Sequence, residues 1–373
     1  MSGVNLSSVG PPKRRPGAPG RHKLLRHVAS RVAALALLTF TASAFSQSSD
    51  SLLAGRKPPD ASGEEKQIVG IYLSENSKHS FVLLERGGKL YWRDGSGKDW
   101  DSVLNGNQVF LPSEGGKLLG YSVSRDNSGN VTGFCHLNSC YVRTDPGARR
   151  EPASHVSTPR PIEQLRGEAL AASPPEENRN FRSPDLVELA PLDHAIHLDI
   201  RYATANDFLG APVYTEARAF LQRPAAESLL RVLRKLQPLG YGLLIYDGYR
   251  PWYVTKIFWD ATPAEGKIFV ADPAEGSRHN RGCAVDLTLY DLKTGQPVEM
   301  TGNYDEMSPR SFPSYPGGTS LERWHRDLLR RAMESEGFTV YESEWWHFDY
   351  KDWHEYGILN IPFEKLGAGS ATK

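Results

Sequence analysis

A stretch near the middle of this 373-residue chain is too polar to form a hydrophobic core of its own. Residues 144–183 are rich in Pro, Ser, Arg and Glu, and include Pro159-Arg160-Pro161 and Pro174-Pro175-Glu176-Glu177. Such a composition buries too little apolar surface to offset the lost chain entropy. The stretch is therefore predicted to be an extended linker with at most one short helix, around 162–172. The chain must then fold as separate units on either side of it, which its length permits.

On the N-terminal side, residues 67–143 carry short apolar runs separated by turn signals. These signals include Arg86-Gly87-Gly88 and Asp126-Asn127-Ser128-Gly129-Asn130. The spacing is typical of a small antiparallel sandwich or barrel, so a small all-β domain is predicted. The predicted strands are 68–73, 80–84, 89–92, 108–111, 118–123 and 140–142. No catalytic residue types gather there, so we expect an accessory domain for wall or partner binding, or a purely structural one.

Three cysteines bear on the compartment and on metal binding. Cys135 and Cys140 lie close together, and an oxidising compartment favours a disulfide between them. A metal knuckle that uses His136 is the alternative, although it would lack a fourth ligand. Cys283 is left unpaired, and because small residues flank it, we expect it to be buried and not to act as a nucleophile.

The first 44 residues contain the three parts of a secretory signal peptide in order. A basic stretch precedes the apolar run 32–38, and Ala42-Ser43-Ala44 supplies the small residues of a cleavage site. The apolar run is too short to anchor the chain in a bilayer, which takes about 20 residues. We therefore expect cleavage after Ala44 and an exported product, periplasmic or secreted, with no transmembrane anchor. A disordered basic tail is the alternative.

The charge balance gives no sign of a nucleic-acid partner. Lys and Arg together number 44, as do Asp and Glu, so the formal net charge is zero. Nucleic-acid-binding domains usually carry a strongly basic surface. We therefore expect no nucleic acid among the partners.

The C-terminal part, residues 184–367, mixes the helical and the strand periods. Strands and helices alternate without the regular spacing of βαβ units, which predicts an α+β domain with a mainly antiparallel sheet and flanking helices. The predicted strands are 197–202, 241–246, 283–290 and 338–341, and the predicted helices are 224–236, one from Pro251, and 321–336.

Two segments of this domain concentrate metal-ligating side chains, His279 with Asp286 and, much later, His347. Two imidazoles and one carboxylate are the ligand set of many hydrolytic zinc sites, with a fourth position left for water. On one helix, His279 and Asp286 would lie about 10 Å apart, and on one strand they would point to opposite faces. A single metal can be shared only if the chain bends between them, and Gly282 permits this bend. Asp286 is then expected on a strand and His279 on the loop before it.

Glu344, three residues before His347, is predicted to be the catalytic base. A fourth protein ligand would leave no room for the reactive water, whereas a carboxylate beside the metal can accept a proton from that water. Arg250 follows an apolar strand, and a fixed guanidinium suits the oxyanion of a tetrahedral intermediate. Read alone, Arg250 is more simply a surface residue or a partner of Asp247.

These motifs lie in a specific order. The chain has Asp-Gly-Tyr-Arg-Pro at 247–251, then Ser-x-His-x-x-Gly-x-Ala-x-Asp over 277–286, and finally Glu-x-x-His over 344–347. In this order they resemble the D-alanyl-D-alanine dipeptidases of the VanX type, within the zinc D,D-peptidases, over roughly 192–363. The resemblance implies one zinc ion per chain and assigns the following roles: His279, Asp286 and His347 as zinc ligands, Glu344 as general base, and Arg250 as the residue that stabilises the transition state.

Three substrate-binding residues follow from the same resemblance. Tyr202 and Ser277 match residues that line the substrate pocket, and Asp305 matches an acid that meets the substrate ammonium. Their plainer interpretations are a strand aromatic, a loop cap and a solvated acid. The segment between Pro251 and Ser277 looks shorter than in the vancomycin-resistance members, so one wall of the pocket is expected to be more open.

The activity that the resemblance implies is zinc-dependent hydrolysis of D-Ala-D-Ala in cell-wall peptide turnover. Its substrate would be a small D,D-dipeptide or a peptidoglycan fragment. A D,D-carboxypeptidase or endopeptidase acting on stem peptides is one alternative, and a noncatalytic wall-binding protein that retains zinc is another. The joint presence of Glu344 and Arg250 argues against the noncatalytic alternative.

Other conspicuous side chains of this domain receive simpler interpretations. Trp345 and Trp346 are expected either to shield the site or to be ordinary core aromatics. Four histidines are not expected to bind metal: His194, His197, His325 and His354.

Overall fold

The computed structural model of this chain describes residue 52 and residues 55–113, 116–145 and 157–367. The signal peptide predicted at 1–44 lies outside these residues. None of the helices within the described ranges is long and apolar enough to span a membrane.

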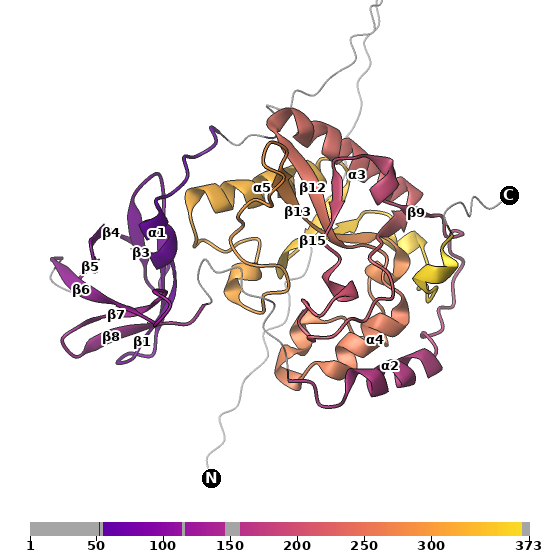
Figure 1. The fold of residues 1–373 in the computed structure, drawn as a ribbon, viewed down its shortest axis with the longest axis horizontal. Coiled ribbons are helices and arrows are strands. Elements are labelled where there is room, and N and C mark those ends of the chain that lie inside the picture. Colours follow the sequence, from indigo (N-terminus) through magenta and orange to yellow (C-terminus); the bar gives the residue numbers. More distant parts are fainter. Residues whose placement is uncertain (1–51, 53–54, 114–115, 146–156, 368–373) are drawn as a thin grey trace, which may run out of the picture. The chain divides into compact units, whose positions relative to one another are not determined.

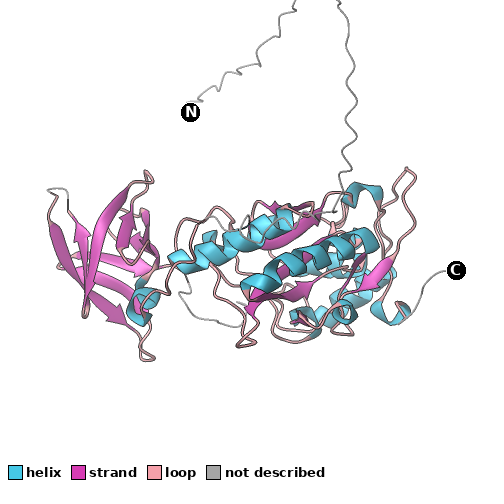
Figure 2. Cartoon of the chain, turned by 90° about the horizontal axis from the view of Figure 1, so that it is seen from above, coloured by secondary structure: helices cyan, strands magenta, loops and turns pink. Residues whose placement is uncertain are grey.

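A closed barrel of eight antiparallel strands occupies residues 70–143 (Figure 2). Each strand pairs with the next along the chain, and β8 pairs with β1 to close the barrel. Helix α1 (Gly63–Ile68) precedes it. The strands are β1 (Gly70–Ser74), β2 (Ser80–Glu85), β3 (Leu90–Arg93), β4 (Asp99–Asn105), β5 (Gln108–Pro112), β6 (Leu118–Arg125), β7 (Val131–His136) and β8 (Ser139–Arg143). The all-β character expected for this part is thus confirmed, in the form of a barrel.

Two of these strands, β4 and β7, are absent from the set that the sequence predicts. In β4 the residues are mostly polar, and Ser102 is its one fully buried position. In β7, Gly133 interrupts the apolar run, and a Cβ there would lie 2.3 Å from the backbone oxygen of Tyr141. Neither strand therefore shows the clear alternation by which strands are recognised, and β7 needs its glycine because another backbone passes so close.

Aromatic side chains fill the barrel. Tyr72, Trp92 and Phe134 are all buried, and the ring centroid of Tyr72 lies 4.4 Å from that of Phe134 and 6.5 Å from that of Trp92. An eight-stranded barrel is just wide enough for its own side chains to fill the interior. The barrel is therefore a packed hydrophobic core.

Cys135 and Cys140 face each other on β7 and β8 and form a disulfide. Both sulfur atoms are therefore in a covalent bond, which leaves neither for a metal knuckle with His136. Cys283 is buried, and this burial raises the pKa of its thiol to about 12. Such a thiol is protonated at neutral pH, which agrees with the expectation that it is not a nucleophile.

The described residues of the predicted linker include one helix, α2 (Ile162–Ala171), which lies beside α4 (Trp252–Ala261) (Figure 1). Leu165 and Ala169 of α2 are fully buried. They are four residues apart and therefore share one face of the helix. The short helix expected in this segment thus packs on the C-terminal domain.

The C-terminal domain is built on a five-stranded sheet with the strand order β10-β12-β13-β15-β14 (Figure 1). β10 and β12 are parallel, and the other three pairs are antiparallel. Helices α3 and α5 pack against the sheet, while β9 and β11 form a separate pair. The bounds are β9 (Leu186–Glu188), β10 (Ile196–Leu198), β11 (Phe220–Gln222), α3 (Arg223–Leu236), β12 (Tyr241–Asp247), β13 (Ala284–Asp291), α5 (Ser320–Glu334), β14 (Phe338–Tyr341) and β15 (Glu344–Tyr350). The predicted α+β class with a mainly antiparallel sheet is confirmed.

Two elements that carry site residues differ from the predicted elements. The strand predicted at 197–202 ends as β10 at Leu198, and the chain then enters a 3₁₀ turn, Arg201–Ala203, which carries Tyr202. In addition, the motif at 344–350 is itself a strand, β15, with five of its seven residues buried. A strand covered on both faces has no polar alternation, so its residues carry no strand signal that could be recognised in the sequence.

The buried face of α3 generates a test of this core. Leu229 is fully buried, whereas Leu230 is half-buried. Leu229→Ala removes core contacts and leaves a cavity, and we expect it to lower the free energy of unfolding by about 2–5 kcal/mol. Leu230→Ala makes the same chemical change and should cost at most half as much. Urea unfolding followed by near-UV circular dichroism measures both, and equal losses would contradict this packing of α3.

Candidate metal centre and active site

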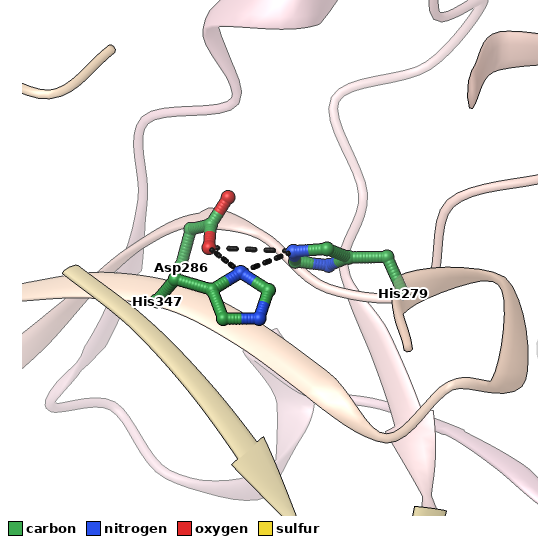
Figure 3. Close-up of side chains that lie close together, drawn as sticks. All are labelled: His279, Asp286 and His347. Atoms are coloured by element: carbon green, nitrogen blue, oxygen red, sulfur yellow. Dashed lines mark hydrogen bonds and ion pairs between the residues drawn. The ribbon is translucent and has the colours of Figure 1, made fainter. Parts of the chain in front are cut away.

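Strand register brings the three predicted metal ligands together. Asp286 on β13 is the direct antiparallel partner of His347 on β15. His279 lies in a 3₁₀ turn just before β13. That turn ends at Gly282, whose φ of 67° is left-handed and favours glycine. Figure 3 shows the three side chains pointing toward one another from these elements.

The ligand atoms are spaced as a common cation requires. His279 Nε2 lies 3.0 Å from His347 Nδ1 and 3.3 Å from Asp286 Oδ1, and His347 Nδ1 lies 3.0 Å from Asp286 Oδ1. Atoms bound at about 2.1 Å to one tetrahedral centre are separated by roughly 3.4 Å. The spacing and the N,N,O donor set therefore both fit a zinc ion.

The outer nitrogen of each imidazole fixes its tautomer. His279 Nδ1 lies 2.6 Å from the Gly248 backbone oxygen, and His347 Nε2 lies 2.9 Å from Asp349 Oδ1. Both oxygens can only accept, so both outer nitrogens carry the proton and both inner nitrogens carry a lone pair. Such outer partners orient metal-binding imidazoles in many proteins. Two lone pairs and a carboxylate oxygen that face one another repel unless a cation lies between them.

The electrostatics of the cluster favour a positive charge at its centre. Burial opposes ionisation of Asp286, but the two neighbouring imidazoles outweigh it and lower the pKa of this carboxyl. Burial disfavours protonation of His347, but the neighbouring carboxylates of Asp286 and Asp349 raise its pKa well above the usual value. The surroundings of both groups thus favour a positive charge between them, which a bound metal would supply.

Glu344 lies at the edge of this cluster, with its side chain 15% exposed. Its Oε2 lies 3.8 Å from His347 Nδ1, beyond hydrogen-bond distance. Burial raises the pKa of its carboxyl to about 7, and the nearby Asp286 charge adds to this effect. A carboxylate whose pKa is close to neutral can both accept and return a proton, which is what the predicted base must do.

Arg250 is buried and faces the same cluster. Its Nε and Nη2 each lie 2.8 Å from Asp247 Oδ2, and Nη2 lies 3.8 Å from Asp286 Oδ2. Asp247 also accepts a hydrogen bond of 2.7 Å from the hydroxyl of Tyr214. The simpler interpretation, a partner of Asp247, is thus true together with a location in the pocket. The ion pair fixes the guanidinium in one orientation.

A cavity of about 280 Å³ opens beside the cluster, and the three predicted substrate-binding residues line it: Tyr202, Ser277 and Asp305. The Tyr202 hydroxyl donates to Asp305 Oδ1 at 3.1 Å. Among the described residues, Asp305 Oδ2 has no hydrogen-bond partner although it is buried. Burial and the Asp286 charge raise the pKa of Asp305 well above its usual value. A cationic group in this cavity would satisfy the orphaned oxygen and keep Asp305 ionised.

The structure also identifies supporting residues that the sequence did not reveal. Asn280 Nδ2 donates to the Arg250 backbone oxygen at 2.8 Å and so ties two motif segments together. Tyr304 donates from its hydroxyl to Asp286 Oδ2 at 3.2 Å. Asp349, which accepts from His347, is two residues away on the same strand, so the period of two could have indicated it. No comparable signal marks Asn280 or Tyr304.

The two adjacent tryptophans line different cavities. Trp346 lines the cavity beside the cluster, whereas Trp345 lines the other one. Among the described residues, the group that could hold a metal is His279, Asp286 and His347, and it includes none of the other four histidines. His325 is buried in α5, with Nε2 3.2 Å from the Tyr241 hydroxyl.

A buried His-Asp-His cluster with a carboxylate and an arginine in one pocket defines a hydrolytic metallopeptidase. Residues 182–363 match the family Peptidase_M15, described as D-Ala-D-Ala dipeptidase. A D-alanyl-D-alanine dipeptidase of Escherichia coli (strain K12) is 35% identical over 179 residues, which are 48% of this chain and 91% of that protein. The chain belongs to this dipeptidase family.

Two further relatives support membership of the same family. A D-alanyl-D-alanine dipeptidase of Enterococcus faecium is 37% identical over 177 residues, 43% of this chain and 88% of that protein. One of Streptomyces coelicolor is 33% identical over 186 residues, 45% of this chain and 92% of that protein. The family match begins after the barrel, which ends at Arg143.

Removing any ligand should abolish stoichiometric metal binding. His279→Ala, Asp286→Ala and His347→Ala each delete one of three donors, so metal affinity should fall by more than the roughly 10–100-fold that loss of a supporting hydrogen bond costs. His325→Ala is the control, because it removes a buried imidazole outside the cluster. Inductively coupled plasma mass spectrometry on dialysed protein gives the metal per chain. A ligand variant that keeps one metal per chain would contradict this assignment.

Proposed function

We propose that this protein is an exported, zinc-dependent D,D-dipeptidase that hydrolyses D-Ala-D-Ala released in cell-wall peptide turnover. The observation that carries the proposal is that one cavity offers two separate sites for positive charge. The lone pairs of His279, Asp286 and His347 call for a cation at one end, and Asp305 calls for an ammonium group nearby. A free dipeptide presents a scissile carbonyl and an ammonium group a short distance apart, so it fits both.

The residues can be placed in a hydrolytic sequence. A bound zinc ion would supply a Lewis acid that polarises the scissile carbonyl and acidifies water. Glu344 accepts a proton from the attacking water and delivers it to the leaving amine as the C–N bond breaks. Arg250 is oriented to stabilise the negative charge that develops on the carbonyl oxygen. Asp305 and Tyr202 hold the substrate ammonium, while the indole of Trp346 excludes water from that wall.

The two alternatives make different demands on the site. A carboxypeptidase or endopeptidase acting on stem peptides meets an acylated nitrogen where a dipeptide has an ammonium, and the unpartnered oxygen of Asp305 favours the dipeptide. A noncatalytic wall-binding protein has no use for Glu344 beside the metal ligands. The proposed export and the proposed action on peptidoglycan fragments rest on the signal-peptide pattern before Ala44 and on the substrate class.

Glu344→Gln should separate catalysis from metal binding. The substitution keeps the size of the side chain but removes the proton acceptor, so kcat for D-Ala-D-Ala should fall about 10²–10⁴-fold. Zinc content should stay at one per chain. A ninhydrin or coupled assay of D-alanine release, run with metal analysis on the same sample, provides the measurement. Undiminished turnover would rule out Glu344 as the base.

Asp305→Asn tests the choice between dipeptides and longer peptides. The variant loses a charge-assisted hydrogen bond of about 1.5–3 kcal/mol, so kcat/KM for D-Ala-D-Ala should fall roughly tenfold to a hundredfold. N-acetyl-D-Ala-D-Ala has no ammonium group, and its hydrolysis should be slow in the wild type and nearly unchanged in the variant. A wild-type enzyme that prefers the acetylated substrate or a stem pentapeptide would support the carboxypeptidase alternative.

A further inference from the structure

A second cavity, of about 300 Å³, lies close to the metal ligands along two strands. Thr288 on β13 comes two residues after Asp286, and Trp345 on β15 comes two residues before His347. Asp286 is paired with His347 in antiparallel register, and both Thr288 and Trp345 line this second cavity. The cavity is thus a neighbour of the active pocket.

Two buried donors in the wall of this cavity have no partner. Thr288 Oγ1 and Trp345 Nε1 make no hydrogen bond to any described residue, and both side chains are at most 2% exposed. Buried polar groups without a partner are rare and call for an explanation. Two other orphaned atoms, Asp286 Oδ1 and Asp305 Oδ2, are explained by the metal and the substrate of the active pocket. Because a water molecule occupies about 30 Å³, the cavity has room for a ligand larger than one water.

The charges around the cavity indicate which ligand fits. Besides the two donors, Arg201 lines it, with its guanidinium over the rings of Tyr246 and Tyr304 at 5.2 and 5.6 Å. The carboxylates of Asp199 and Glu299 also line it, with side chains 43% and 49% exposed, and they pair with Arg201 at 3.2 Å and with Lys66 at 2.7 Å. A ligand carboxylate would share the Arg201 guanidinium with Asp199, and a ligand ammonium would join the exposed acids.

Glu322 is a buried acid in the same wall, and it does not oppose this arrangement. Its Oε2 accepts a hydrogen bond of 2.7 Å from the Thr319 backbone nitrogen at the start of α5. Burial raises the pKa of Glu322, which lowers the negative charge that it presents. The capping role already accounts for this carboxylate.

Tyr304 forms the connection between the two cavities. Its ring lines the second cavity and stacks on Tyr246, with centroids 4.2 Å apart and planes 11° apart. Its hydroxyl donates to Asp286 Oδ2, and the next residue, Asp305, lines the active pocket. Asp305 has a φ of 60°, an unusual value for a residue with a side chain, so the backbone here is closely constrained. A displacement of Tyr304 therefore reaches a metal ligand and the ammonium-binding acid together.

We propose that the second cavity binds a free small α-amino acid and reports its occupancy to the active pocket through Tyr304. Free D-alanine belongs to this class, and its link to turnover rests on the proposed function, because D-alanine is the product of D-Ala-D-Ala hydrolysis. The binding step itself does not depend on that function. The site would let accumulated product restrain further hydrolysis without occupying the catalytic pocket.

Binding is tested with the indole N–H resonance of Trp345 in the full-length, zinc-loaded, ¹⁵N-labelled protein. Trp345→Phe assigns this resonance, since it removes the N–H and keeps an aromatic ring. D-Alanine should shift the resonance in a saturable way. Propionate lacks the ammonium and ethylamine lacks the carboxylate, so each should bind at least about fivefold more weakly, the factor that the loss of one hydrogen bond typically costs.

Two variants distinguish this cavity from the active pocket. Thr288→Val keeps the side-chain shape and removes the hydroxyl, so the Kd for D-alanine should rise about fivefold. Asp305→Asn weakens ammonium binding in the active pocket and should leave the Trp345 shift in place. Thr339→Val, on the exposed side of β14, makes the same chemical change outside the cavity and should change nothing. If Thr288→Val does not fold, Glu299→Gln at the solvent side tests the ammonium contact instead.

Each result of this experiment either supports or overturns the proposed binding site. A saturable shift that survives Asp305→Asn and weakens in Thr288→Val supports the proposal. A shift that disappears in Asp305→Asn but not in Thr288→Val places D-alanine in the active pocket and overturns it. No shift with D-alanine, L-alanine or glycine means that the cavity holds solvent only, which also overturns it. If the protein binds D-alanine in this way but does not hydrolyse D-Ala-D-Ala, the dipeptidase proposal fails while the binding site stands.

Discussion

The C-terminal domain holds three electron-rich ligand atoms close together against their mutual repulsion. Two imidazole lone pairs and a carboxylate oxygen face one another within 3.3 Å in a buried place, and they are stable there only around a positive charge. The sheet pairs Asp286 with His347, and the backbone oxygen of Gly248 and the carboxylate of Asp349 fix the imidazole tautomers. These contacts orient the donor atoms toward one another, so the protein itself positions the ligands of a metal.

Two neighbouring regions then lie at this sheet, and each contains a cavity. One region contains the cluster, Glu344 and the active pocket. The other contains Thr288 and Trp345, and Tyr304 lies between them with its hydroxyl on Asp286. Two adjacent tryptophans therefore serve different cavities. Burial alone does not distinguish their roles, because both are almost completely covered.

The barrel and the dipeptidase domain are stabilised by different interactions. The barrel is closed, so it has no free strand edge, and its aromatic interior and one disulfide complete a small core. The dipeptidase domain has a larger core and uses buried charges, which cost free energy unless they are paired. Arg250 with Asp247, and Asp286 with the two imidazoles, are such pairs, and each of them lies at the active pocket.

By itself the sequence determined the α+β class, and it predicted the division of the chain and the metal-binding and catalytic side chains, because these depend on residue type, spacing and local period. His279 and Asp286 could share a metal only through a bend, and Gly282 indicated where that bend lies. Tertiary structure alone decided which side chains support them. Asn280 and Tyr304 act through contacts with residues distant in sequence, and local patterns carry no information about such contacts. Strands β4 and β15 escaped prediction for a related reason, since β4 is largely polar and β15 is covered on both faces, so neither shows the alternation that marks a half-buried strand.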